Sequence, residues 1–235
     1  MADARDIFDN ACRHLHEPYV LGASVPKNDA NWKGPWDCAE FVSWLVYQEA
    51  GFLFGCTDDH ANPAVADAYT GAWQRDSDTK GRRVGVETAA GIKGAVLLRY
   101  PPGTKKGTGH IVLADGQGGT VEAHSHIDGV IRGKVDDRWW DTGILVPGIT
   151  YDESAPSYPW HPPATIYRLG GSAMNGAYVR QIQAVLAARS FYQGQDTGSF
   201  DQATADAVAA FQAANGLVPD GAVGPQTANA LGLNW

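Results

Sequence analysis

The chain has 235 residues, of which 44% are hydrophobic and 10% aromatic, so it can bury a sizeable core and has room for one medium domain and one small domain. Its formal net charge is -8, with 18 Lys and Arg against 26 Asp and Glu. This acidic balance argues against nucleic acid as a partner, because phosphate binding depends on clustered basic residues. No apolar run approaches the roughly 20 residues of a membrane-spanning helix, so we expect no membrane insertion.

The first twenty residues are charged and amphipathic and lack the apolar stretch of a signal peptide. We therefore expect the protein to be made in the cytoplasm without an export signal. Three cysteines, Cys12, Cys38 and Cys56, occur without C-x-x-C spacing. An odd number with this spacing predicts free thiols rather than a disulfide framework. The histidine and cysteine spacing also gives no tetrahedral zinc set, so we expect neither metal nor cofactor.

Residues 34–44, GPWDCAEFVSW, place Cys38 between a turn-forming Gly34-Pro35 pair and a run that is apolar on nearly every side. The pattern predicts a helix buried inside the domain, with Cys38 in its first turn. The helix dipole and unpaired backbone N–H groups favour a thiolate there. A thiol in this place is either a small core residue or a nucleophile, and a nearby base would favour the nucleophile.

A base is available in residues 109–125, GHIVLADGQGGTVEAHS, where two strand-like runs flank a turn-rich DGQGG. The pattern predicts a hairpin centred near Gln117. Strand alternation then places His110, Glu122 and His124 on one face, with His124 opposite His110 and Glu122 its diagonal neighbour. A Cys, a His and a third group that orients the imidazole are the parts of an acyl-transfer thiol enzyme. Both Glu122 and His124 are open as that third group.

The composition changes near residue 170 to an Ala-, Gln- and Gly-rich tail. We place a first domain at 1–169, a Gly- and Ser-rich linker at 170–176 and a second domain at 177–235. The tail repeats itself, because 198–208 (GSFDQATADAV) and 221–231 (GAVGPQTANAL) each read as a Gly turn followed by an Ala-rich helix. With an amphipathic helix starting near Tyr178, these segments predict a small three-helix domain. It contains no nucleophile or acid pair, so we expect it to bind a ligand.

The tail resembles the peptidoglycan-binding module found on many cell-wall hydrolases. The resemblance covers nearly all of it and includes FQ at 211–212, NGL at 215–217 and DG-x-VG-x-x-T at 220–227. It implies that bacterial peptidoglycan is the partner.

The segments EPYVLGA, DCAEFVSWLVYQEAG and GHIVLADGQGGTVEAHS resemble, in this order, the NlpC-type cell-wall cysteine peptidases. The resemblance implies an α+β, papain-like domain with a central helix packed on an antiparallel sheet. It further implies Cys38 as nucleophile, His110 as general base and Glu122 as third member, with His124 as the alternative.

Two further positions carry over from the same motifs, because Tyr19 and Asp37 would line the subsite for the N-terminal end of the peptide. Ala39-Glu40 replaces the family's usual Ser-Gly. A charge at Glu40, so close to the nucleophile, is expected to change the charge preference of the cleft.

These observations predict a monomeric peptidoglycan hydrolase that cuts the stem peptide between D-glutamate and the diamino acid, which is the bond implied by the family resemblance. An N-acetylmuramoyl-L-alanine amidase with the same thiol chemistry and an inactive wall-binding protein are the alternatives. Without an export signal, we expect the enzyme to reach the wall as a phage endolysin released by a holin, or as an effector delivered by a secretion system.

Overall fold

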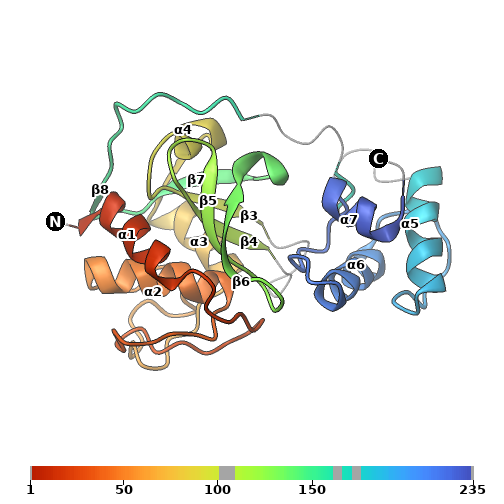
Figure 1. The fold of residues 1–235 in the computed structure, drawn as a ribbon, viewed down its shortest axis with the longest axis horizontal. Helices are drawn as coiled ribbons and strands as arrows, with labels where there is room; N and C mark the ends of the chain where they lie inside the picture. Colours follow the sequence, from red (N-terminus) through yellow and green to blue (C-terminus); the bar gives the residue numbers. More distant parts are fainter. Residues whose placement is uncertain (1, 101–108, 161–165, 171–175, 234–235) are drawn as a thin grey trace.

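The computed structural model describes residues 2–100, 109–160, 166–170 and 176–233. A sheet with surrounding helices forms the N-terminal part, and three helices form the C-terminal part (Figure 1). The helices are α1 (Ala4–Ala11), α2 (Cys38–Ala50), α3 (Thr70–Thr79), α4 (Val86–Ala90), α5 (Ala177–Ala188), α6 (Gln202–Ala214) and α7 (Pro225–Leu231), with short 3-10 turns η1 (Cys12–His14) and η2 (Val135–Asp137). The strands are β1 (Ala2–Asp3), β2 (Arg82–Val84), β3 (Val96–Arg99), β4 (His110–Ala114), β5 (Gly119–Ser125), β6 (Gly129–Lys134), β7 (Thr142–Leu145) and β8 (Ile149–Thr150).

The main sheet is antiparallel and has the strand order β2-β7-β3-β4-β5-β6. Strands β4 and β5 pair Leu113 with Val121 and Ala114 with Thr120. This register centres the hairpin at Gln117, which confirms the predicted hairpin. The α+β class is confirmed as well.

The two faces of this sheet pack against different elements. Ile111, Leu113, Val121 and Ala123 share one buried cluster with α2. Alternate residues of β4 join a second cluster with α4 and Trp140. Helix α2 is buried continuously from Cys38 to Val46, which explains why its sequence is apolar on nearly every side. The predicted central helix on an antiparallel sheet is therefore confirmed.

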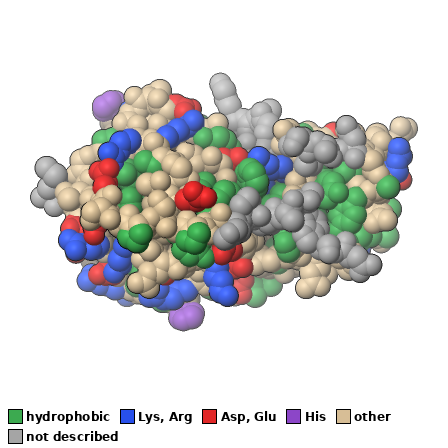
Figure 2. Space-filling view, turned by 90° about the horizontal axis from the view of Figure 1, so that it is seen from above, with side chains coloured by type: hydrophobic (Ala, Val, Ile, Leu, Met, Phe, Trp, Pro, Cys, Tyr) green, Lys and Arg blue, Asp and Glu red, His purple; other side chains and the backbone are tan. Residues whose placement is uncertain are grey.

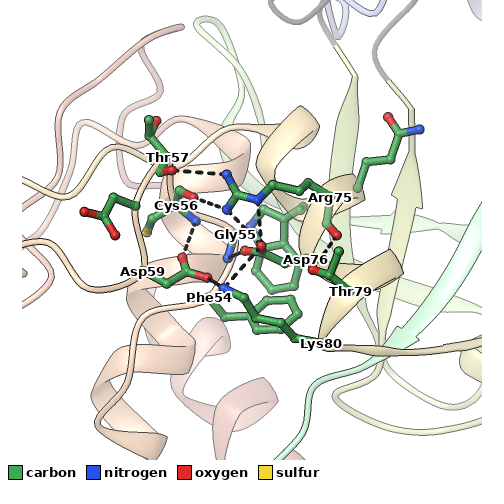
Figure 3. Close-up of polar contacts among 12 residues, drawn as sticks. Phe54, Gly55, Cys56, Thr57, Asp59, Arg75, Asp76, Thr79 and Lys80 are labelled. Carbon is green, nitrogen blue, oxygen red and sulfur yellow. Dashed lines mark hydrogen bonds and ion pairs between the residues drawn. The ribbon is translucent and has the colours of Figure 1, made fainter.

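A buried polar cluster ties the loop after α2 to α3 (Figure 3). The Asp76 carboxylate accepts from the backbone N–H of Gly55 at 2.8 Å, and Arg75 donates to the Cys56 carbonyl at 2.6 Å. Gly55 has a φ of +76°, and a Cβ there would lie 2.2 Å from the indole nitrogen of Trp73. Only glycine fits this position, because both the backbone conformation and the close approach exclude a side chain.

The C-terminal helices enclose their own apolar core, as predicted for a three-helix domain. The same hydrogen-bonding pattern occurs in each of its two halves: a buried Gln accepts from a glycine N–H and donates to a threonine hydroxyl. The two sets are Gln183 with Gly198 and Thr204, and Gln212 with Gly221 and Thr227. The sequence repeat is thus a structural repeat, and each Gln side chain fixes the turn before the next helix.

The helical part contacts the end of the sheet at β3. Arg99, the last residue of β3, forms a buried ion pair with Asp220 of the loop before α7. Arg99 is also the strand partner of His110 on β4. Tyr167 makes an isolated bridge with Val223, so the chain just before the expected linker pairs with the helical part. Most of the expected linker, 170–176, lies outside the described residues, and the domain boundaries stay predictions.

The described surface carries charges of both signs. On the face shown in Figure 2, basic and acidic side chains are interspersed along the rim rather than gathered in one patch. None of the helices in the described ranges is long and apolar enough to cross a membrane.

Candidate active site

Cys38 occupies the first turn of α2, and Asp37 is the residue that caps this helix. The Asp37 carboxylate accepts from the N–H of Ala39 at 3.0 Å and from the N–H of Gly22 at 2.9 Å. Burial raises the pKa of Asp37. These contacts fix the loop of residues 19–23 against the start of the helix, and they satisfy backbone donors that a helix start leaves unpaired.

The Cys38 side chain is only 5% exposed. Burial raises the pKa of the thiol well above its usual range, and the nearby charge of Asp37 adds to this effect. Hydrogen bonds from the backbone N–H groups of Ala39 and Ile111 lower the pKa but do not outweigh burial. Burial therefore favours the protonated thiol, whereas the backbone N–H groups near the helix start favour the thiolate.

His110 begins β4 and contacts Glu122 of β5. Its Nε2 lies 2.6 Å from Oε2 of Glu122, both residues are 1% exposed, and the imidazole stacks on Trp140 with a centroid distance of 6.2 Å. Burial lowers the pKa of His110 to about 4, although Glu122 opposes this shift. The imidazole is consequently uncharged near neutral pH and can accept a proton.

The Glu122 carboxylate is ionised although it is buried. Burial raises its pKa, but the positive charge of Arg138 and the hydrogen bond with His110 together lower it by more than burial raises it. The pKa of Glu122 therefore lies well below its usual range. Thr120 donates to the other carboxylate oxygen at 3.1 Å. An ionised carboxylate only accepts hydrogen bonds, so Nε2 of His110 carries the proton and Nδ1 is left as the acceptor.

His124 has a different partner from the one its position opposite His110 would suggest. Its Nδ1 lies 3.0 Å from Oδ2 of Asp128, in the turn before β6. Burial lowers the pKa of His124. Of the two candidates for the third member, Glu122 contacts His110 and His124 contacts Asp128.

Helix α2 packs against β4, which places Cys38 beside the residue that follows His110. The thiol's contact on β4 is the N–H of Ile111, the residue after His110. Within the described ranges, the thiol makes no hydrogen bond to the His110 imidazole. Catalytic hydrogen bonds in ligand-free enzymes are often long and shorten when substrate binds, so the arrangement fits a Cys-His pair at rest.

Tyr19 lies at the same place. It is buried, pairs with Trp36 in an isolated bridge and has its pKa raised chiefly by burial. The next residues, Val20 and Leu21, are 49% and 52% exposed. The structure thus brings Tyr19 and Asp37 together with Cys38 beside an exposed apolar segment.

Glu40 does not face the surface, which corrects the expectation that it changes the charge of the cleft. It is buried, forms an ion pair with the fully buried Lys27 and accepts from the N–H of Ala68 at 2.8 Å. Burial raises its pKa to about 7, against the lowering effect of Lys27. The pair joins α2 to two neighbouring loops.

Three residues around the His110–Glu122 pair were not predicted from the sequence. Arg138 and Trp140 come from the loop after η2, and Gly133 lies on β6, a strand that was not predicted either. The only signal is the cluster DDRWW at 136–140, in which a cation precedes two tryptophans. Nothing in the spacing of that cluster points to the hairpin.

A small cavity lies between the sheet and the helical part. Its lining includes Arg99 and Arg138 from the first and Gln212, Asp220 and Thr227 from the second, and it holds a free volume of about 30 Å³. The lining does not include Cys38 or His110. In the described parts of the chain, no three His, Cys, Asp or Glu side chains are grouped so as to hold a metal ion.

Comparison with solved structures found NlpC/p60 domains. The chain is 21% identical to the NlpC/p60 domain of the peptidoglycan hydrolase SagA, with a TM-score of 0.41 and coverage of 61% of this chain and 99% of that one. For the p60 domain of an antigen from M. avium subspecies paratuberculosis the identity is 17%, the TM-score 0.43 and the coverage 62% and 94%. For an NLP/p60 family protein similar to lipoprotein from Staphylococcus aureus subsp. aureus Mu50, the identity is 16%, the TM-score 0.40 and the coverage 61% and 41%.

No curated protein matches the chain in sequence. Residues 175–231 match the family model described as "Putative peptidoglycan binding domain". This match confirms the resemblance found in the tail, and it places the C-terminal part of the chain with the peptidoglycan-binding domains.

Proposed function

We propose that this protein is a peptidoglycan hydrolase that cleaves an amide bond by cysteine catalysis. The observation that carries the proposal is the buried His110–Glu122 pair at the start of β4, next to a cysteine in the first turn of a helix. The peptidoglycan-binding match at 175–231 supports the wall as substrate.

In the proposed mechanism the Cys38 sulfur attacks the amide carbonyl while Nδ1 of His110 takes the thiol proton. Glu122 stabilises the imidazolium that forms, because it accepts from Nε2. His110 then returns the proton to the leaving amine, and backbone N–H groups at the start of α2 stabilise the oxyanion. Water releases the acyl group from the sulfur and restores the thiol. A neutral thiol beside a neutral imidazole makes proton transfer part of the attack itself.

For the bond, we propose the one between D-glutamate and the diamino acid of the stem peptide. Tyr19 and Asp37 support this assignment, because a carboxylate beside the nucleophile would attract the free amino group at the N-terminal end of a stem peptide. The distance between the bound amino group and the Cys38 sulfur would then determine which amide bond of the stem peptide is cut.

Mass spectrometry of soluble fragments released from purified peptidoglycan tests the proposal, with Cys38→Ala as the matched control. Fragments with a new N-terminus at the third stem residue are expected from the wild-type protein only. Intact stems freed from muramic acid would instead identify an amidase. If the wild-type protein binds the wall but releases nothing, the proposal fails in favour of a wall-binding protein, and equal release by Cys38→Ala would refute the cysteine mechanism.

We further propose that the enzyme acts on the wall after holin-type or secretion-system release. Helix α1 buries Ile7 and Phe8 in the main core, so this segment is part of the folded domain. Cells that express the protein should lyse when a holin is co-expressed and not without it. Lysis without the holin would contradict this route.

A further inference from the structure

The loop after η2 holds the His110–Glu122 pair from the side. Trp140 stacks on the His110 ring at an interplanar angle of 27° and donates from its indole nitrogen to the Val135 carbonyl at 2.9 Å. Two residues earlier, Arg138 places NH1 3.5 Å from Oε2 of Glu122. One short loop thus contacts both members of the pair.

Arg138 is itself buried, with a side chain that is 9% exposed. Its NH1 atom lies away from solvent and makes no hydrogen bond within the described residues, so its close polar neighbour is the Glu122 carboxylate. A buried guanidinium without a neighbouring negative charge is very unfavourable. The position of Arg138 therefore depends on Glu122 being ionised, and the ionised state of Glu122 depends on Arg138.

Room for the carboxylate comes from the neighbouring strand. A Cβ at Gly133 of β6 would lie 2.1 Å from Oε1 of Glu122 and 2.8 Å from the hydroxyl of Thr120. Glu122 is thereby confined between Gly133, Thr120 and Arg138, with Oε2 directed at His110. In this position the carboxylate reaches Nε2 of the imidazole with one oxygen and the Thr120 hydroxyl with the other.

We propose that Arg138 is a positioning residue for the proposed reaction, which keeps Glu122 ionised and directed at Nε2 of His110, so that Nδ1 is the basic nitrogen facing the thiol. A protonated Glu122 would donate to Nε2 instead, and the proton would move to Nδ1. His110 in that tautomer cannot take the thiol proton. This inference rests on the proposed function for its kinetic consequences, whereas the tautomer does not depend on catalysis.

Arg138→Gln, Arg138→Lys and Arg132→Gln in the full chain test the proposal. Arg132 is the matched control, because it lies on β6 next to Gly133 but its side chain contacts Cys12 and neither member of the pair. Arg138→Gln should lower kcat about 100-fold with little change in KM, and it should move the acidic limb of the kcat profile to higher pH. Arg138→Lys should restore most of kcat, and Arg132→Gln should behave as wild type.

A double-mutant cycle separates this role from a structural one. With Glu122→Gln already present, Arg138→Gln should cost no further activity, because its effect passes through Glu122. Independent, additive losses would overturn the proposal. So would a folded Arg138→Gln variant with the wild-type pH profile.

Nitrogen-15 NMR of labelled histidine supplies a readout that does not require hydrolysis. His110 should carry its proton on Nε2 in the wild-type protein and in Arg138→Lys, and Nδ1 should become protonated in Arg138→Gln at mildly acidic pH. An unchanged tautomer in Arg138→Gln would refute the proposal. If the wild-type protein shows the expected tautomer but releases no wall fragments, the proposed function fails while the role of Arg138 stands.

Discussion

At the scale of single residues, the candidate site consists of buried groups whose pKa values are shifted by burial and by one another. His110 is buried and neutral, Glu122 is buried and ionised, and Cys38 is buried with its proton in place. The three states are compatible because one cation, Arg138, compensates the one anion of the pair. In the proposed mechanism, the reaction would therefore begin from a neutral thiol and a neutral imidazole, with proton transfer and attack in one step.

The first prediction concerns the third member of the site. Glu122→Gln should lower kcat by about a thousandfold or more, because the imidazolium loses its stabilising charge and the tautomer is no longer fixed. His124→Gln should retain most of kcat, because His124 contacts Asp128 and not His110. Turnover on purified wall measures both variants, and the reverse order of losses would make His124 the third member.

A second prediction concerns acid stability. The folded-state pKa of His110 is about 4, against an ordinary value of 6.5, so the unfolded chain binds a proton that the folded chain does not. The free energy of unfolding should therefore decrease as pH falls below 6.5, by roughly 2 to 3 kcal/mol at pH near 4.5. Urea unfolding at pH 7 and at pH 4.5 measures the loss, which should be smaller in His110→Gln. Equal losses in both proteins would show that His110 is not the group responsible.

At the scale of elements, α2 has to present Cys38 at its first turn while it is buried along most of its length. Two charged groups achieve this inside the core. Asp37 caps the helix and binds the Tyr19 loop, and Glu40 pairs with Lys27 to hold the neighbouring loops. The start of the helix is thus fixed from both sides.

The third prediction follows from the buried pair. Lys27→Met leaves the Glu40 carboxylate without a compensating charge and should destabilise the protein by about 3 to 5 kcal/mol. The double variant Lys27→Met with Glu40→Gln should recover much of this loss. Lys93→Met, which breaks the exposed pair with Asp9, should change the free energy of unfolding by less than about 1 kcal/mol. Chemical denaturation measures all three, and a loss for Lys27→Met no larger than for Lys93→Met would contradict the argument.

Sequence patterns predicted those elements whose periodicity is strong. The helix after Cys38, the hairpin at 110–124 and the helices of the tail were predicted, because each shows apolar periodicity or turn residues that stand out locally. The diagonal contact of Glu122 with His110 also followed from hairpin register.

Long-range contacts were not predictable in this way. Apolar and polar residues alternate only weakly along strand β6. Its Gly133 is needed because a side chain there would collide with the Glu122 carboxylate, which belongs to another strand. Arg138 follows the short turn η2 and contacts a carboxylate on another strand. Glu40 has the sequence pattern of a surface charge, and only the structure shows its buried partner Lys27, thirteen residues earlier. Partners of this kind are set by the fold, and local patterns carry no trace of them.

At the scale of the whole molecule, the helical part is attached to the sheet by more than a chain connection. Arg99 of β3 and Asp220 of the helical part form a buried ion pair, and Gln212 donates to the same Asp220 carboxylate at 2.8 Å. Burial lowers the pKa of Arg99, although the charge of Asp220 opposes this shift. The Asp220 carboxylate thus takes part both in the hydrogen bonds inside the helical part and in the contact with the sheet.

The fourth prediction tests this attachment. Arg99→Met leaves Asp220 with its partners in the helical part but removes the contact across the interface. Calorimetry should show one unfolding transition for the wild-type protein and two for Arg99→Met, because removing one partner of a buried ion pair costs about 3 to 5 kcal/mol and here weakens the docked state alone. Arg180→Met, at an exposed pair on α5, should unfold as wild type. A single transition in Arg99→Met would show that other contacts suffice.

The place of Arg99 has a geometric consequence. It ends β3 directly opposite His110, so the surface that would hold the wall is joined to the strand pair that carries the base. A flexibly tethered enzyme searches a sphere around its anchor and cuts anywhere within reach of its tether. For the proposed function, a helical part docked on the sheet would hold the Cys38 sulfur at one distance and one orientation from each anchoring point. Cuts on an ordered polymer would then recur at a fixed spacing from the anchor.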